Sequence, residues 1–468
     1  MTAEVVSGVH WAFSRSVLEH GAFVFGGLLL YVLVTRIGHQ RRHPSAAIAW
    51  VLIIAVLPYI GIPLFLLFGT RKFARPIRQL KPPRQTPSEQ AGPAWAISLL
   101  AVLAVPAPTR NHSIRFHEDG LVSQQALLTM IEGARQGIDL CNYILGADAT
   151  GNTLVAALMR CARGGVRVRV LLDAIGGLQS SRSQIGALRE AGVTVRWFMP
   201  LLHNPLHGRM NLRNHRKLVV SDGATLWTGG RNFASEYFID VNRQRAWPDL
   251  SFVVRGPLAA QAQSLFERDW HVAGNGDRPC SIAAVVDVAN GIPAQLVPSG
   301  PDYADDTVYA LLLTAAFQAQ HRILAVTPYF VPDDALLAAW CMACRRGVEV
   351  TLLVPARSNH RLADWARERS LRELADAGAR IYLFPEMIHA KAVIIDEQLA
   401  LCGSANLDGR SLFLNFELTT AFYGLAEIVW LASWIERYTQ KSAPYLAQNP
   451  PWWRDVIEGM VRAVGFQL

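Results

Sequence analysis

The chain has 468 residues, of which 51% are hydrophobic and 18% charged, and its mean hydropathy is +0.19. This length allows two or more domains, and the positive hydropathy is unusual for a wholly soluble enzyme. The net charge of +8 comes from one end, since residues 1–84 hold ten of the 45 basic and two of the 37 acidic residues, leaving 35 of each. A nucleic-acid-binding fold carries positive charge on its own surface, so this distribution argues against nucleic acid and for anionic lipid.

Two apolar stretches near the N-terminus are long enough to cross a bilayer. Val17–Ile37 is strongly apolar, and Ser45–Thr70 carries no charged residue. Because about 20 apolar residues span the hydrocarbon core, residues 1–69 are predicted to form a transmembrane helical hairpin. A signal peptide is disfavoured, since no small-residue cleavage site follows the first stretch. Pro58 and Pro63 are expected to kink the second helix or make it re-entrant.

Residues 70–105 are predicted to connect this anchor to the body. Arg71–Pro93 is rich in proline and basic residues and is expected to lie along the lipid surface. Trp95–Val105 is too short to span and is expected to pack on the membrane or against the body. More positive residues follow the second stretch than lie between the two, which predicts a cytoplasmic body, although the intervening arginines oppose this.

An internal repeat occupies the rest of the chain. RGGVRVRVLL from Arg163 matches RGVEVTLL from Arg346, and AGVTVR from Ala191 matches AGARIY from Ala377. Each half alternates helix-period segments with short Val/Ile/Leu strands, which is typical of α/β lobes with mostly parallel strands. We therefore predict two pseudo-symmetric lobes, residues 106–290 and 291–445, that face each other across a twofold axis.

One longer motif occurs once in each half: His-x-Lys-x4-Asp, followed ten residues later by Asn. The two copies are His215, Lys217, Asp222 and Asn232, and His389, Lys391, Asp396 and Asn406. Apolar alternation after each copy predicts a strand with His and Lys on one face. A single His-x-Lys could be a core histidine beside a surface lysine, but two copies with equal spacing disfavour that interpretation.

Two imidazoles and two ammonium groups suit phosphodiester chemistry. One histidine can attack phosphorus while the other protonates the leaving alcohol and later deprotonates the acceptor. The lysines, with Asn232 and Asn406, can donate to the phosphate oxygens. No cofactor or metal is predicted: His203 and His207 lack an acidic neighbour, and Cys341-x-x-Cys344 has no second pair and is interpreted as buried thiols.

These stretches resemble the signature of the phospholipase D superfamily. NYILGADATG, RGGVRVRVLLDAIGG, TPYFVPDDALL and GSANLDGRSLFLNFEL also look like segments of bacterial cardiolipin synthases, and the likeness covers nearly the whole chain. It implies an α/β fold of two phospholipase D-type lobes behind a multi-pass anchor in the bacterial inner membrane. Asn142 and the missing glycine before Met387 depart from the family pattern outside the catalytic set.

The resemblance also implies roles for individual residues. His215 would be the nucleophile and His389 the general acid, then base. Asp249 and Glu417 stand where the family places the carboxylates that orient the imidazoles, and the sequence leaves their pairing open. Asp222 and Asp396 belong to the catalytic motif, yet they fall at strand ends and are interpreted as turn and salt-bridge residues. Four further residues match family positions near the site, where structural roles are equally possible: Tyr143, Tyr329, Arg410 and Ser411.

Such enzymes transfer a phosphatidyl group from one phosphatidylglycerol to another and release glycerol. A phospholipase D-type hydrolase, a phosphatidyltransferase that uses phosphatidylethanolamine, and a membrane-tethered nuclease are the alternatives, and the neutral body counts against the nuclease. The sequence leaves the oligomeric state open. In the tail, residues 446–468, Trp452–Phe466 places apolar residues on one helical face, which predicts an amphipathic helix on the membrane or on its own lobe.

Overall fold

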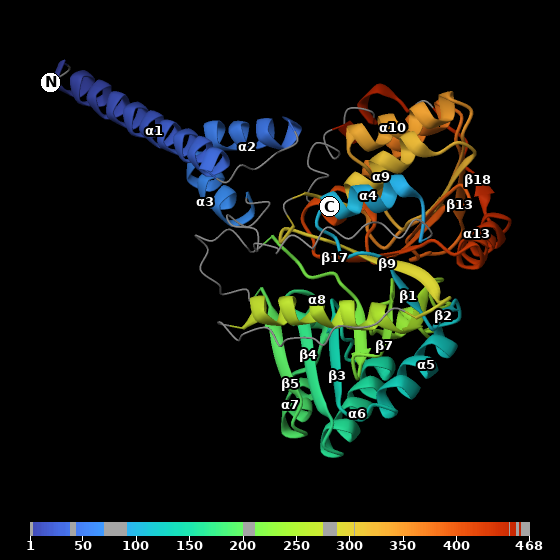
Figure 1. Ribbon diagram of the computed structural model, residues 1–468. Helices are drawn as coiled ribbons and strands as arrows, with labels where there is room; N and C mark the ends of the chain where they lie inside the picture. The colour runs from blue at the N-terminus through green and yellow to red at the C-terminus, as the bar shows by residue number, and fades with distance from the viewer. Residues whose placement is uncertain are drawn as a thin grey trace.

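The computed structural model describes residues 3–37, 44–69, 91–199, 211–274, 288–303, 305–448, 450–454 and 458–459. Most of the predicted linker, the segment with His203 and His207, and most of the amphipathic stretch lie outside these ranges. The described chain comprises an N-terminal helical unit and a body of two α/β lobes (Figure 1). The predicted two-lobed α/β fold is confirmed.

The N-terminal unit contains α1 (Ala3–Ile37), α2 (Pro44–Val56) and α3 (Pro58–Phe68). Within α1, Leu18–Thr35 is long and apolar enough to cross a membrane, the one such helix in the described ranges. The second predicted stretch is divided at Leu57, because Pro58 starts a new helix and its ring cannot continue the preceding one. Both pieces pack on α1, and their shared core includes Tyr31 and Phe65.

The short apolar stretch after the linker packs against the body. It forms α4 (Ala94–Val102), whose Ala96 and Leu100 are fully buried in the core of the second lobe. Of the two placements expected for this stretch, the protein contact is the one observed.

The first lobe is built on a seven-stranded sheet in the order β2-β8-β7-β6-β3-β4-β5. The strands are β2 (Ser113–His117), β3 (Gly137–Asn142), β4 (Arg167–Asp173), β5 (Thr194–Phe198), β6 (Leu218–Ser221), β7 (Thr225–Gly229) and β8 (Ser251–Arg255). Helices α5 (Gly120–Glu132), α6 (Ala149–Arg163) and α7 (Arg182–Glu190) cover its outer face, and α8 (Pro257–Ala273) covers the face toward the second lobe (Figure 1).

The second lobe repeats this plan on a nine-stranded sheet in the order β1-β9-β17-β15-β14-β10-β12-β13-β18. The strands are β1 (Thr109–Asn111), β9 (Ile292–Ser299), β10 (Arg322–Val326), β12 (Glu349–Pro355), β13 (Arg380–Phe384), β14 (Ala392–Ile395), β15 (Leu399–Gly403), β17 (Glu417–Phe422) and β18 (Ala443–Pro444). Its longer helices are α9 (Thr307–Gln318), α10 (Asp334–Arg345), α11 (Arg361–Asp376) and α13 (Leu425–Thr439). A small ladder pairs β11 (Phe330–Val331) with β16 (Leu407–Asp408), ahead of α12 (Gly409–Phe413).

The expectation of mostly parallel strands is wrong. Within the two large sheets only β3-β4-β5 and β10-β12-β13 run parallel, and the other neighbours are antiparallel. The small β11–β16 ladder is parallel as well. After each His-x-Lys copy the chain turns back at once, at Asp222 or Asp396, so the next strand pairs with the previous one as a hairpin. A parallel neighbour would require a longer crossover connection.

The two lobes share a core. One buried cluster joins α8, α13 and the facing sides of both sheets, and includes Phe266 and Trp434. Phe116 of β2 stacks on Trp430 of α13 with ring centroids 4.6 Å apart. In addition, β1 pairs with β9, so Thr109–Asn111 belongs to the sheet of the second lobe although it precedes the first. The lobes therefore form one continuous body.

Candidate active site

The two His-x-Lys copies meet at the seam between the lobes. Each histidine lies in the extended segment just before its strand, β6 or β14, rather than inside the strand as expected. The His215 N–H donates to the Phe416 carbonyl at 2.8 Å, and the His389 N–H donates to the Pro248 carbonyl at 2.8 Å. The backbone N–H of each histidine is thus bonded to a carbonyl of the opposite lobe. This bond takes the place of the ladder bond that the histidine would make inside a strand.

The carboxylates that orient the imidazoles cross the same seam. Nδ1 of His215 lies 3.0 Å from Oε1 of Glu417, and Nδ1 of His389 lies 2.7 Å from Oδ2 of Asp249. Both carboxylate side chains are fully buried. A carboxylate at Nδ1 favours the tautomer whose Nδ1 carries the proton, which leaves the Nε2 lone pair available to phosphorus.

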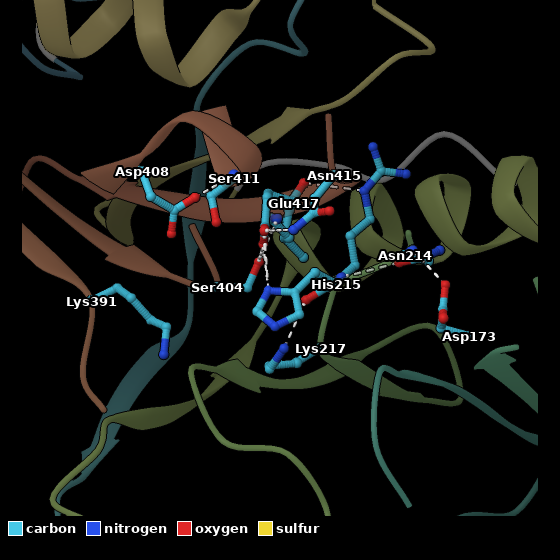
Figure 2. A network of polar contacts seen from close by, with 12 residues as sticks. Asp173, Asn214, His215, Lys217, Lys391, Ser404, Asp408, Ser411, Asn415 and Glu417 are labelled. Atoms are coloured by element: carbon cyan, nitrogen blue, oxygen red, sulfur yellow. Dashed lines mark hydrogen bonds and ion pairs between the residues drawn. The ribbon is translucent and has the colours of Figure 1, made fainter. Parts of the chain in front are cut away.

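Both carboxylates are held in the charged form. Burial alone would raise the pKa of Glu417, but His215 and its hydrogen bond outweigh burial and lower it. The pKa of Asp249 is likewise lowered, with His389 and Lys391 opposing burial. Glu417 also accepts hydrogen bonds from Ser404 Oγ at 2.5 Å and from the Asn415 amide at 3.2 Å (Figure 2). The imidazoles therefore face fixed negative charges.

The two motif lysines lie beside their own histidines. Lys217 Nζ donates to the His215 carbonyl at 2.9 Å, and Lys391 Nζ donates to the His389 carbonyl at 2.5 Å. Lys391 Nζ also lies 2.7 Å from Nδ1 and 3.0 Å from Nε2 of His389. Because Nδ1 donates to Asp249, the ring nitrogen that can accept from Lys391 is Nε2. In Figure 2 Lys391 lies to the left of the His215 ring and Lys217 lies below it.

Burial lowers the pKa values of both motif lysines and both motif histidines. Burial lowers the pKa of Lys217 to about 7 and that of Lys391 to about 8, despite the raising effect of the carboxylates. Burial also lowers the pKa of His215, and burial together with Lys391 lowers that of His389 to about 3. A bound phosphodiester would add negative charge beside these lysines and imidazoles and would therefore favour their protonated forms.

The two motif asparagines are both buried. Asn232 donates from Nδ2 to the Tyr237 hydroxyl at 2.9 Å. The Oδ1 atoms of Asn232 and Asn406 are buried and have no hydrogen-bond partner among the described residues. Because an unpaired buried acceptor is unfavourable, these oxygens fit a site that a hydrogen-bond donor on a bound molecule completes.

The motif aspartates do not contact the imidazoles. Asp222 accepts hydrogen bonds from the backbone N–H groups of Arg135, Gln136 and Gly137 at 2.8–2.9 Å, and Asp396 accepts from those of residues 320–322 at 2.8–3.0 Å. Both occupy left-handed turns, with φ of 53° and 51°. This geometry matches the expected turn role, with backbone N–H groups in place of the expected salt bridges, so the two aspartates belong to the motif but stand away from the imidazoles.

Sequence reasoning missed a buried arginine under the site. Arg216, the middle residue of the first His-x-Lys, is fully buried and donates to Asp269 at 2.5 Å and to the Glu417 carbonyl at 3.1 Å. It also reaches the Ser299 carbonyl at 3.1 Å and so ties the first lobe to two strands of the second. The second copy has Ala390 at this position, and that asymmetry was the available signal.

An open pocket of about 340 Å³ reaches His215. Tyr143, Tyr329, Arg410 and Ser411 all line it, and Tyr143 meets the His215 ring edge-on with centroids 5.1 Å apart. The other imidazole is more covered: Tyr237 and Trp247 lie 4.9 and 5.9 Å from the His389 ring. The His215 side chain is 14% exposed and that of His389 is 6% exposed, so the two histidines differ in access.

The Cys341-x-x-Cys344 pair lies on α10. Cys341 and Cys344 are free thiols, and burial raises the pKa of both. Within the described ranges, no group of three His, Cys, Asp or Glu side chains could hold a metal ion.

Two α/β lobes with one His-x-Lys site at their seam define the class of phospholipase D-like proteins. A family model described as cardiolipin synthase, phospholipase D-like domain, matches residues 127–270 and 312–439. A second, described as phospholipase D-nuclease N-terminal, matches residues 27–69. The chain belongs to the cardiolipin synthase family of phospholipase D-like proteins.

Relatives in this family match almost end to end. The chain is 32% identical to cardiolipin synthase A of Serratia proteamaculans over 93% of this chain and 96% of that protein. It is 33% identical to cardiolipin synthase A of Pseudomonas putida over 81% of this chain and 83% of that protein. The crystal structure of phosphatidylserine synthase from Haemophilus influenzae matches with a TM-score of 0.61 and 15% identity, over 77% of this chain and 97% of that one, which shows a shared fold.

Proposed function

We propose that this phosphatidyltransferase makes cardiolipin from two molecules of phosphatidylglycerol, releases glycerol, and works through a phosphohistidine intermediate. The observation that carries the proposal is the pair of buried imidazoles at one seam, each bonded at Nδ1 to a carboxylate of the opposite lobe. Both histidines therefore carry a proton on Nδ1, and His215 is more exposed to the pocket than His389. A two-step transfer needs two such histidines in different roles.

In the first step Nε2 of His215 attacks phosphorus, because His215 is the imidazole that the open pocket reaches. The P–O bond to glycerol breaks, and the glycerol oxygen takes a proton from Nε2 of His389. Lys217, Lys391 and the two motif asparagines donate to the oxygens on which charge gathers. The anionic substrate raises the pKa of His389 toward its ordinary value, so that the ring can carry this proton.

In the second step a hydroxyl of another phosphatidylglycerol enters the site. Nε2 of His389 takes its proton, the oxygen attacks phosphorus, and the bond to His215 breaks. Water in place of this lipid would give hydrolysis, so transfer requires that the intermediate be shielded. The positive pocket lining, which includes Arg213 and Arg410 as well as Asp408, favours a neutral glycerol headgroup over a cationic ethanolamine.

The substrate assignment is tested with the full chain reconstituted in vesicles of labelled phosphatidylglycerol, with and without phosphatidylethanolamine. We expect labelled cardiolipin and one released glycerol per cardiolipin in both mixtures, and a reversal when glycerol is added. Phosphatidic acid as the only product would identify a hydrolase. Release of ethanolamine, or a need for phosphatidylethanolamine, would identify the other phosphatidyltransferase.

The covalent step is tested with the His389→Ala variant. A donor with a good leaving group needs no general acid, so this variant should still load His215 while overall turnover falls by about 10²- to 10⁴-fold. After an alkaline quench, which preserves phosphohistidine, peptide mapping should place the label on His215. Label on another residue would refute the assignment of the nucleophile, and absence of label would refute the covalent route.

We also propose that α1 and the α2–α3 pair cross the bacterial inner membrane as a hairpin with the body in the cytoplasm. The apolar span Leu18–Thr35, the uncharged Ser45–Gly69 and the positive residues that follow support this topology. A reporter enzyme that works only in the cytoplasm should be active when fused to the C-terminus, and one that works only in the periplasm should be inactive there. Activity of a periplasmic reporter at that position would overturn the topology.

A further inference from the structure

Large apolar side chains are exposed on the segments that line the pocket leading to His215. From the first lobe, Ile175 lines the pocket and is 38% exposed, and Leu178, three residues on, is 69% exposed. From the second lobe, Ala363 lines the pocket, and its neighbours on α11, Leu362 and Trp365, are 58% and 51% exposed. Both lobes therefore contribute apolar surface at the same opening.

Two further tryptophans are attached to α11. Trp452 and Trp453 are 80% and 50% exposed. Their segment is held by the buried carboxylate of Glu458, which pairs with Arg372 of α11 at 2.6 Å and with Arg454 at 2.9 Å. We call the set Leu178, Leu362 and Trp365 the entrance rim, and Trp452 and Trp453 extend the exposed apolar surface along the same helix.

The composition of the entrance rim fits a lipid interface. Clustered exposed apolar side chains on a protein surface mark an interaction site, and tryptophan is enriched at the depth of lipid headgroups. Three exposed arginines, Arg357, Arg361 and Arg369, lie on α11 or just before it, where they can face anionic headgroups, whereas the exposed Glu373 and Asp376 lie at its far end. Apolar contact and positive charge thus occur on the same surface.

We propose that the entrance rim inserts into the interfacial layer of an anionic phospholipid bilayer, so that the pocket opens directly onto lipid headgroups. The inference rests on the proposed function, because it takes a phospholipid as substrate. Lifting a two-chain lipid out of the bilayer would expose its acyl chains to water, which is strongly unfavourable. With the rim immersed, the phosphodiester can reach His215 while the chains stay in the membrane.

The insertion is tested without any measurement of catalysis. An environment-sensitive fluorophore is attached to full-length protein through Leu178→Cys or Leu362→Cys, with the native cysteines replaced by alanine. The protein is placed in nanodiscs of phosphatidylglycerol and phosphatidylcholine that contain lipid with a quencher on the acyl chain. Matched controls are Phe317→Cys and Met342→Cys, which are 56% and 45% exposed on α9 and α10, near the starts of β10 and β12 and away from the pocket.

We expect blue-shifted emission and strong quenching at positions 178 and 362, and neither effect at 317 and 342. Equal quenching at all four positions, or none at 178 and 362, would overturn the proposal. A blue shift without quenching that depends on protein concentration would assign the rim to contact between two copies of the chain, which also overturns it. These outcomes do not depend on whether the enzyme makes cardiolipin.

A second measurement links the rim to turnover. In the triple variant Leu178→Ser, Leu362→Ser and Trp365→Ser, the ratio of the rate on bilayer lipid to the rate on monomeric short-chain phosphatidylglycerol should fall about tenfold, since three apolar contacts with the bilayer are lost. The control variant Phe317→Ser, Met342→Ser should keep the wild-type ratio. An unchanged ratio in the triple variant would contradict a role of the rim in substrate access. Inactivity of the wild type on both lipids would instead indicate failure of the proposed function.

Discussion

At the scale of single residues, the crossed carboxylates distinguish the two chemical roles. Glu417→Gln should prevent loading of His215 from any donor, because the nucleophile loses its orienting charge. Asp249→Asn should block only steps that need His389, so a donor with a good leaving group should still label His215. Each variant should lower kcat by about 10³- to 10⁴-fold with little change in KM. Pre-steady-state labelling and steady-state rates measure both effects.

Asp222→Asn is the comparison for these variants. Its carboxylate accepts three backbone N–H groups at a turn, so we expect a loss of stability of about 1–3 kcal/mol and a smaller effect on kcat. If Asp249→Asn abolished labelling and Glu417→Gln preserved it, the assignment of His215 as nucleophile would be reversed.

The pH dependence follows from the depressed pKa values. Lys217, with a pKa of about 7 in the free enzyme, is charged below that pH and neutral above it, so kcat/KM should fall as pH rises through 7 to 8. The pKa of His215 is lowered, so the nucleophile stays unprotonated down to a lower pH. The acid limb of the profile, in which kcat/KM falls as the pH decreases, should therefore lie below the ordinary histidine pKa of about 6.5.

Lys217→Arg separates these limbs, because a guanidinium remains charged across the accessible range. Its alkaline limb should move upward by at least one pH unit, whatever its maximal rate, while the acid limb stays in place. A limb near pH 7 that persists in Lys217→Arg would show that another group controls phosphate binding. Profiles of kcat/KM on one lipid dispersion provide the measurement.

At the scale of elements, Arg216 holds the lobes together under the site. Its guanidinium bonds to Asp269 of α8, to Ser299 at the end of β9 and to Glu417 at the start of β17. Arg216→Ala leaves Asp269 buried without its partner and should destabilise the body by about 3–5 kcal/mol, measured by thermal unfolding. The control is Arg322→Ala, whose exposed pair with Glu436 should contribute about 0–1 kcal/mol. Similar losses in both variants would contradict an interlocking role for Arg216.

The sequence indicated the motif directly, but it indicated the positions of the helices and strands without their arrangement. Apolar periodicity indicated the helices and strands of both lobes, but it carries no information on strand direction, and the hairpin turns at Asp222 and Asp396 made most neighbours antiparallel. Pro58 was predicted to kink the second apolar stretch, and in the structure a new helix begins there. A proline shows where a helix is interrupted, while the packing on α1 decides how its halves lie.

At the scale of the whole molecule, the N-terminal unit should matter for membranes rather than for chemistry. Removal of residues 1–94 keeps both lobes and most of α4, so it should lower the rate on bilayers at least tenfold more than the rate on detergent-dispersed lipid. The comparison uses purified full-length and shortened protein at equal concentration. Equal losses in both assays would mean that these residues are part of the catalytic fold.

By itself the sequence determined that there are two lobes with one motif in each, because duplication and spacing are properties of the chain. It also indicated ten candidate residues for the chemistry. Only the tertiary structure decided which carboxylate faces which histidine. Glu417 is 202 positions from His215 and Asp249 is 140 positions from His389. Since the halves are pseudo-symmetric, each carboxylate could locally have served either ring. The packing of α8 and α13 between the sheets closes the seam and makes the pairing crossed.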